Sequence, residues 1–153
     1  KDPVFLVVVD DSEEMHQALQ FACGRAKAVG SKVALMYCIA PSEFVYWAGV
    51  GKLMRQEARQ AAEEKMTIHA QYAQGLTGKI PLLNVREGDT GVELLLLIDE
   101  EPSIALLVLG AHTKSETAGP LINFLMSRGA SLCRAPITIV LGNLSDDQLD
   151  ALF

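Results

Sequence analysis

Five separate runs of mostly apolar residues constrain this chain more than any other feature. They are Val4 to Val9, Val33 to Ile39, Ile80 to Val85, Ile104 to Leu109 and Pro136 to Leu141. Such a run, without alternating polar residues, is typical of a strand that is buried on both faces. Because helices must then cover both faces, the pattern predicts a parallel sheet in a doubly wound α/β domain.

The segments between these runs are helical in composition and spacing. Ser12 is the expected cap of the first helix, and Gly30 its expected stop. A long second helix is predicted from about residue 51 to residue 72, which is rich in strong helix formers. A third helix is expected over about residues 92–100, and a fourth from Pro120 to Leu132, because proline suits the first helical position.

The length of 153 residues predicts one domain. We place it at residues 1–142, followed by a short acidic C-terminal tail or helix over residues 143–153. The helix is suggested by Ser145 and Gln148, which have capping-box spacing.

Charge and cysteine usage limit the class of partner and the compartment. Thirteen Lys and Arg residues against 19 Asp and Glu residues give a formal net charge of -6, which repels nucleic acids and anionic membranes. Cys23, Cys38 and Cys133 are scattered within apolar segments, which suits a reducing cytoplasm and no metal site. No apolar stretch approaches the about 20 residues of a membrane-spanning helix.

Several short motifs occur together in one order along the chain. They are Val9-Asp10-x-Ser12-Glu13, the run Leu35 to Ile39, Glu87-Gly88-Asp89, Leu107 to Gly110, and Arg134 to Val140. From about Val4 to Leu141 the chain therefore resembles the universal stress protein family, which has an adenine nucleotide α-hydrolase-like fold. The resemblance implies a Rossmann-like, open, five-stranded parallel sheet with strand order 3-2-1-4-5. It also implies a cytoplasmic stress-response module and a homodimer formed through the last strand, Pro136 to Leu141.

Nucleotide-binding members of that family resemble one another in a phosphate-loop motif: Gly, two residues, Gly, nine residues, Gly, then Ser or Thr. In this chain the motif falls on Gly110, Thr113, Asn123 and Phe124, and only the first position matches. The ring of Phe124 replaces a hydroxyl donor, and one lost hydrogen bond to a charged group costs about 1.5–3 kcal/mol. We therefore expect no tight ATP binding in the family manner. A shifted anion site on Gly119, with Ser115 and Thr117, stays open as an alternative.

The residues at the adenosine half of the family site match the family better than those of the phosphate-loop motif do. By resemblance, Asp10 meets the adenine edge, Val8, Cys38 and Leu109 line the base pocket, and Gly110 lies near the ribose. Each residue also has a purely structural interpretation. Buried branched residues and cysteine fill parallel sheets, a carboxylate at a strand end caps a helix, and glycine permits a tight turn.

These observations favour a binding or regulatory module that is not an enzyme and has no cofactor, with a protein partner still to be identified. The alternative is a member that binds ATP or AMP with Mg²⁺ and hydrolyses or signals slowly. A third hypothesis, redox sensing, predicts reactive cysteines. The aromatic patch of Phe44, Tyr46 and Trp47 is suited equally to covering a ligand, meeting a partner or folding over the sheet edge.

Overall fold

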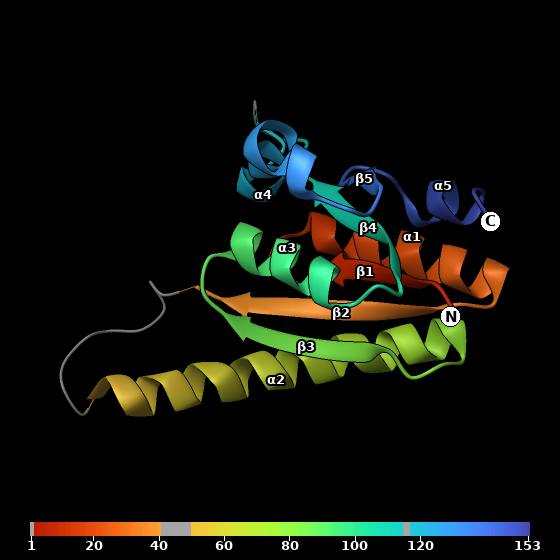
Figure 1. Cartoon of the computed structure of the whole chain (residues 1–153). Helices are drawn as coiled ribbons and strands as arrows, with labels where there is room; N and C mark the ends of the chain where they lie inside the picture. The colour runs from red at the N-terminus through yellow and green to blue at the C-terminus, as the bar shows by residue number, and fades with distance from the viewer. Residues whose placement is uncertain (1, 41–49, 115–116) are drawn as a thin grey trace.

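Strands and helices alternate along the chain (Figure 1). The structure, a computed structural model, describes residues 2–40, 50–114 and 117–153. The strands are β1 (Val4–Val8), β2 (Lys32–Ile39), β3 (Leu82–Glu87), β4 (Ile104–Ala111) and β5 (Ile137–Leu141). The α-helices are α1 (Glu14–Val29), α2 (Val50–Thr77), α3 (Thr90–Glu100), α4 (Pro120–Phe124) and α5 (Asp146–Asp150).

In the described part of the chain, the sheet has five strands in the order β3-β2-β1-β4-β5, and every neighbouring pair is parallel. This confirms the predicted fold class and strand order. The carboxyl ends of β1, β2 and β4 consequently meet at one edge of the sheet. In a doubly wound sheet a ligand binds at that edge, where the strand order reverses.

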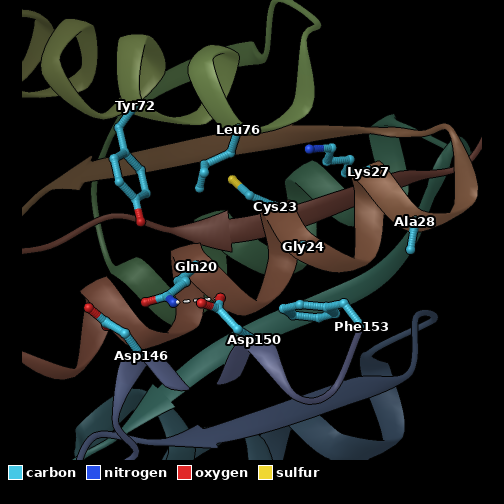
Figure 2. Close-up of a pocket in the computed structure, with 10 residues that line it drawn as sticks. All are labelled: Gln20, Cys23, Gly24, Lys27, Ala28, Tyr72, Leu76, Asp146, Asp150 and Phe153. Atoms are coloured by element: carbon cyan, nitrogen blue, oxygen red, sulfur yellow. Dashed lines mark hydrogen bonds between the residues drawn. The ribbon is translucent and has the colours of Figure 1, made fainter. Parts of the chain in front are cut away.

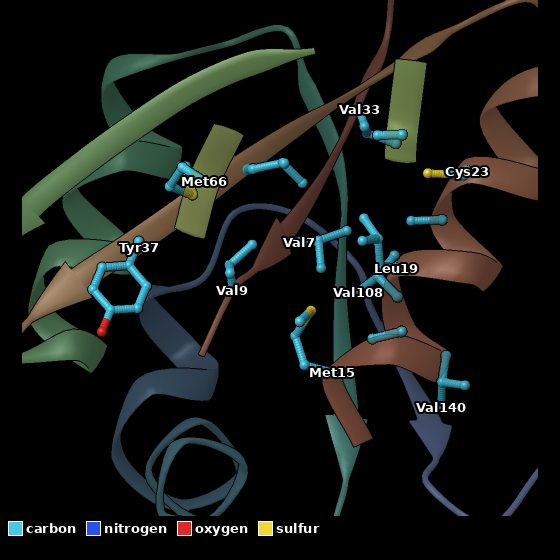
Figure 3. Close-up of a cluster of buried hydrophobic side chains, with 14 of the residues drawn as sticks. Val7, Val9, Met15, Leu19, Cys23, Val33, Tyr37, Met66, Val108 and Val140 are labelled. Atoms are coloured by element: carbon cyan, nitrogen blue, oxygen red, sulfur yellow. The ribbon is translucent and has the colours of Figure 1, made fainter. Parts of the chain in front are cut away.

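Helices cover both faces of the sheet, as the unbroken apolar strands predicted. On one face, α1 and α2 bury residues such as Leu19 and Met66 against Val7 and Val108 (Figure 3). Leu149 of α5 belongs to the same core. On the other face, α3 and α4 pack against the opposite side chains of the same strands. Successive side chains of each strand point to opposite faces of the sheet, so they contribute to two hydrophobic cores, one on each face.

The start of α1 differs from the prediction that Ser12 caps it. The N-cap position is Glu13, and no side chain caps the helix. Ser12 instead donates its backbone N–H and its hydroxyl to the carboxylate of Asp10. The end of the helix is as expected, because Gly30 adopts a left-handed conformation with φ 73° that favours glycine.

The predicted fourth helix, Pro120 to Leu132, is not one α-helix. Pro120 does begin α4, but the backbone becomes π-helical over Leu125–Gly129 and 3₁₀-helical over Ala130–Leu132. The hydroxyl of Ser127 donates to the carbonyl oxygen of Asn123 at 2.7 Å, and such bonding back to the preceding turn disturbs regular helices.

Other element boundaries shift by a few residues. Helix α2 continues to Thr77, β3 begins at Leu82, and β4 runs through Gly110 to Ala111. The predicted C-terminal helix is present as α5, and both hydrogen bonds of the Ser145–Gln148 capping box are formed.

Candidate functional site

A small hollow of about 60 Å³ lies at the carboxyl ends of β1 and β4. Four of the seven predicted site residues line it: Val8, Asp10, Leu109 and Gly110. Residues 118–122, at the start of α4, close it from the other side. The structure therefore brings together four of the five residues assigned to the adenosine half of the site, all except Cys38, in what we call the β1/β4 hollow.

Gly110 is closely packed within this hollow. A Cβ atom built on Gly110 would lie 2.4 Å from the carbonyl oxygen of Glu14 in the first turn of α1. Gly142, just after β5, is similar, since its Cβ would lie 2.7 Å from Cβ of Glu14. These two glycines allow the beginning of α1 to approach the ends of β4 and β5.

Two carboxylates follow β1, and both have partners. Asp10 accepts a hydrogen bond from the backbone N–H of Ser12 at 2.9 Å, before the start of α1, so it does not cap the helix as its structural interpretation predicted. Asp11 is exposed and lies 2.9 Å from Nζ of Lys65 on α2. That hydrogen bond is the main reason that the pKa of Lys65 is raised.

The next two acidic residues face the loop after β4. Oε2 of Glu13 lies 3.3 Å from Nζ of Lys114, and Oε1 of Glu14 lies 3.4 Å from Nδ1 of His112. His112 directly follows β4, and the fold places Glu14 of α1 beside it. The basic side chains of this loop thus lie beside carboxylates, which weaken the attraction of the loop for a polyphosphate.

A second hollow, of about 380 Å³, lies beside the first, and we call it the α3 hollow. It is lined by Ala40 after β2, by residues 88–91 at the start of α3, and by Pro120, Leu121 and Phe124. Pro120 and Leu121 also line the β1/β4 hollow, so α4 separates the two. Cys38 lies close by and donates its thiol hydrogen to the carbonyl oxygen of Gly88, with a sulfur–oxygen distance of 3.3 Å.

Phe124, the residue at the Ser or Thr position of the motif, packs onto the first turn of α3. A Cβ atom on Gly91 would lie 2.6 Å from the ring of Phe124. The other two motif positions lie elsewhere, because Thr113 and Asn123 are exposed and neither lines the β1/β4 or the α3 hollow. The four motif positions therefore do not converge around one hollow.

Sequence reasoning missed the residues at the start of α3. Asp89 caps this helix by accepting a hydrogen bond from the backbone N–H of Val92 at 3.0 Å. Gly88 and Gly91 line the α3 hollow on either side of it. The Glu87-Gly88-Asp89 motif was the available signal, since it follows a strand at the carboxyl edge of the sheet.

Two sequence-based suggestions fall partly or wholly outside the described residues. Ser115, part of the alternative anion site, is outside the described residues. The whole aromatic patch of Phe44, Tyr46 and Trp47 is also outside them. Gly119, also part of the alternative site, has φ 122° and precedes α4.

The cysteines have the features of structural residues. Cys23 is fully buried, and burial raises the pKa of its thiol to about 12, which makes it a poor nucleophile at neutral pH. Cys133 donates its thiol hydrogen to the carbonyl oxygen of Ala135. Within residues 2–40, 50–114 and 117–153, no group of three or more His, Cys, Asp or Glu side chains is arranged to hold a metal ion.

The open parallel sheet, with a hollow where the strand order reverses between β1 and β4, defines a doubly wound α/β domain. Comparison with known proteins specifies it further. Residues 4–140 match the model of the universal stress protein family, and the chain belongs to that family. The sequence has no match among the curated proteins with which it was compared.

Solved structures of universal stress proteins share the fold. UspA from Lactobacillus plantarum is 18% identical with a TM-score of 0.72, over 92% of this chain and 98% of that one. A protein from Archaeoglobus fulgidus in complex with dAMP is 15% identical with a TM-score of 0.65, over 92% and 98%. A universal stress protein in complex with cAMP is 16% identical with a TM-score of 0.58, over 93% and 98%.

Proposed function

We propose that this universal stress protein is a cytoplasmic binding or regulatory module of the stress response that acts without catalysis and does not bind ATP tightly. The observation that carries the proposal is the charge around the β1/β4 hollow. Glu14 lines this hollow and faces His112, and Glu13 lies beside Lys114, so carboxylates accompany both basic residues of the loop and disfavour a triphosphate. Phe124 adds a bulky ring where family nucleotide binders have a hydroxyl.

Binding of a less charged adenine nucleotide is the second candidate. Structurally similar universal stress proteins have been solved in complex with dAMP and with cAMP. Val8, Asp10, Leu109 and Gly110 line one hollow in this chain, which supports a retained adenosine site. The α3 hollow beside it, at about 380 Å³, is within the usual volume of small-molecule sites. AMP carries less negative charge than ATP and would be repelled less by the acidic residues.

A nucleotide titration separates these candidates. A ligand that binds only the folded state must raise the melting temperature. Because we propose that ATP does not bind tightly, we expect ATP with Mg²⁺ at about 1 mM to leave the melting temperature unchanged. Stabilisation by AMP but not by ATP would support the second candidate. Submicromolar binding of ATP by calorimetry would contradict the proposal.

A motif-restoring variant sharpens the same test. Asn123→Gly combined with Phe124→Ser rebuilds the last two motif positions, and we expect it to raise ATP affinity at least tenfold if those residues are what the site lacks. Met126→Ser is the matched control, since it places a serine two residues further on at an exposed position. An equal effect of the control would show that the gain is not specific to the motif.

We also propose a homodimer formed through β5. This strand is at the edge of the sheet, and the side chains of Ile139 and Leu141 are exposed on it. An unpaired apolar edge strand favours pairing with a second copy across a two-fold axis. Light scattering at 10–50 μM is expected to give about twice the mass of the chain, and Ile139→Lys to give the monomer mass. A monomer from the unmodified protein would contradict this part of the proposal.

The cytoplasmic setting rests on composition and family. In the described part of the chain, no helix has the length and apolar character needed to cross a bilayer. The net charge of -6 also disfavours anionic membrane surfaces and nucleic acids as partners.

A further inference from the structure

A third hollow, of about 640 Å³, lies between α1, α2 and α5 (Figure 2). We call it the α1/α5 pocket. It shares no lining residue with the β1/β4 or the α3 hollow. Its floor is one stripe of α1, with residues spaced so that they face the same side of the helix: Gln20, Cys23, Gly24, Lys27 and Ala28. A volume of this size suits a small organic ligand.

The middle of the pocket is apolar. Leu76 of α2 and Phe153 form opposite walls, and Gly24 lies between them (Figure 2). A Cβ atom on Gly24 would lie 2.2 Å from the ring of Phe153, so the glycine makes room for this ring. Cys23, which also lines the pocket, is uncharged, because burial raises the pKa of its thiol and keeps it protonated at physiological pH.

One end of the pocket holds a buried acceptor without a donor. The residue Gln20 is only 8% exposed, and its Nε2 donates to Oδ1 of Asp150 at 3.3 Å. Its Oε1 is buried and has no hydrogen-bond partner. Figure 2 shows the amide nitrogen turned toward Asp150 and the oxygen turned away from it. Buried polar atoms in proteins almost always have a partner, so a ligand that donates a hydrogen bond at this end of the pocket would satisfy this oxygen.

The same end carries negative charge. Asp146 and Asp150, one turn apart on α5, both line the pocket, and Tyr72 faces it from α2. Burial chiefly raises the pKa of Tyr72, and the charges of Asp146 and Asp150 raise it further. Lys27, the basic residue of the lining, lies seven residues along α1 from Gln20, which is about 10 Å of helix rise. Acceptors at one end are thus separated from the cation by the apolar middle.

We propose that the α1/α5 pocket binds a small organic cation, an ammonium group carried on an apolar body. The ammonium group donates to Gln20 Oε1 and faces the carboxylates of Asp146 and Asp150. The apolar body lies between Leu76 and the ring of Phe153, which itself covers Gly24. This site is independent of the proposed nucleotide site and does not rest on it.

The test uses three probes of equal chain length: n-hexylammonium, 1-hexanol and hexanoate. In a titration followed by amide NMR, we expect hexylammonium to cause saturable shifts in residues 20–28 and 146–153. Hexanol should bind at least tenfold more weakly and hexanoate should cause no saturable shift. Equal affinity for hexanol and hexylammonium, or no saturable shifts with hexylammonium, would overturn the proposal.

Matched variants locate the charge. Asp146→Asn is expected to weaken hexylammonium binding about tenfold, whereas Asp147→Asn should change it less than twofold. Both remove one negative charge from the first turn of α5, but only Asp146 lines the pocket. Ala28→Trp, at an exposed position on the pocket wall, should abolish binding while the protein stays folded. Equal effects of the two Asp variants, or full binding by Ala28→Trp, would contradict the assigned site.

Discussion

Replacing Gly110 with alanine is expected to lower the free energy of unfolding by about 3 kcal/mol, at the upper end of the usual cost of overpacking. The added Cβ would lie 2.4 Å from the backbone carbonyl oxygen of Glu14. A backbone atom cannot rotate away as a side chain can, so α1 would have to move off the sheet. Urea unfolding, followed by circular dichroism, measures the change.

Gly75→Ala is the control for this variant. Gly75 is also replaced by alanine, but nothing lies within 4 Å of its Cβ position, and it lies inside α2. Because alanine is the better helix former, this variant is expected to be more stable by up to about 1 kcal/mol. If Gly110→Ala were as stable as the unmodified protein, Gly110 would not be a packing residue, and a ligand role would become its main explanation.

Gly91→Ala is expected to cost about 1–3 kcal/mol, and most of that cost should disappear when Phe124 is also replaced by alanine. The reason is that the Cβ of the new side chain would lie 2.6 Å from the ring of Phe124. Residues in contact show coupling energies of about 0.5–3 kcal/mol in double-mutant cycles. The measurement is the unfolding free energy of both single variants and the double variant.

Gly110→Ala in the Phe124→Ala background provides the comparison. Its clash is with Glu14 and not with the ring, so its cost should be the same with or without Phe124, within about 0.5 kcal/mol. Additivity of Gly91→Ala with Phe124→Ala would mean that the ring does not rest on the start of α3. Phe124 would then be free to enter or leave the neighbouring hollow.

The architecture was predictable because it depends on patterns that act locally and repeat. Unbroken apolar runs such as Val4 to Val9 imply burial on both faces, and that alone requires helices on both sides of the sheet. Gly30, Pro120 and the pair Ser145 and Gln148 fulfil their predicted roles, since each depends on backbone geometry within a few residues. The prediction for Ser12 was wrong because Asp10, two residues away, competes for its hydrogen bonds.

The site was only partly predictable. Strand-end residues such as Val8 and Leu109 come together because parallel strands end at one edge. The motif spacing, in contrast, did not show that Thr113 and Asn123 would lie exposed, away from both hollows. Spacing along a loop does not determine its path, because the path depends on what the loop packs against.

By itself, the sequence determined the parallel sheet, the order of its elements, the acidic surface and the family. Only the tertiary structure decided which glycines are packing residues, which cations the carboxylates meet, and that Gln20, Asp146 and Phe153 share a pocket. The physical reason is distance along the chain. Secondary structure follows from neighbours within a few residues, whereas these contacts join residues from 33 positions apart (Gly91 and Phe124) to 130 positions apart (Gln20 and Asp150), which meet only after the helices pack on the sheet.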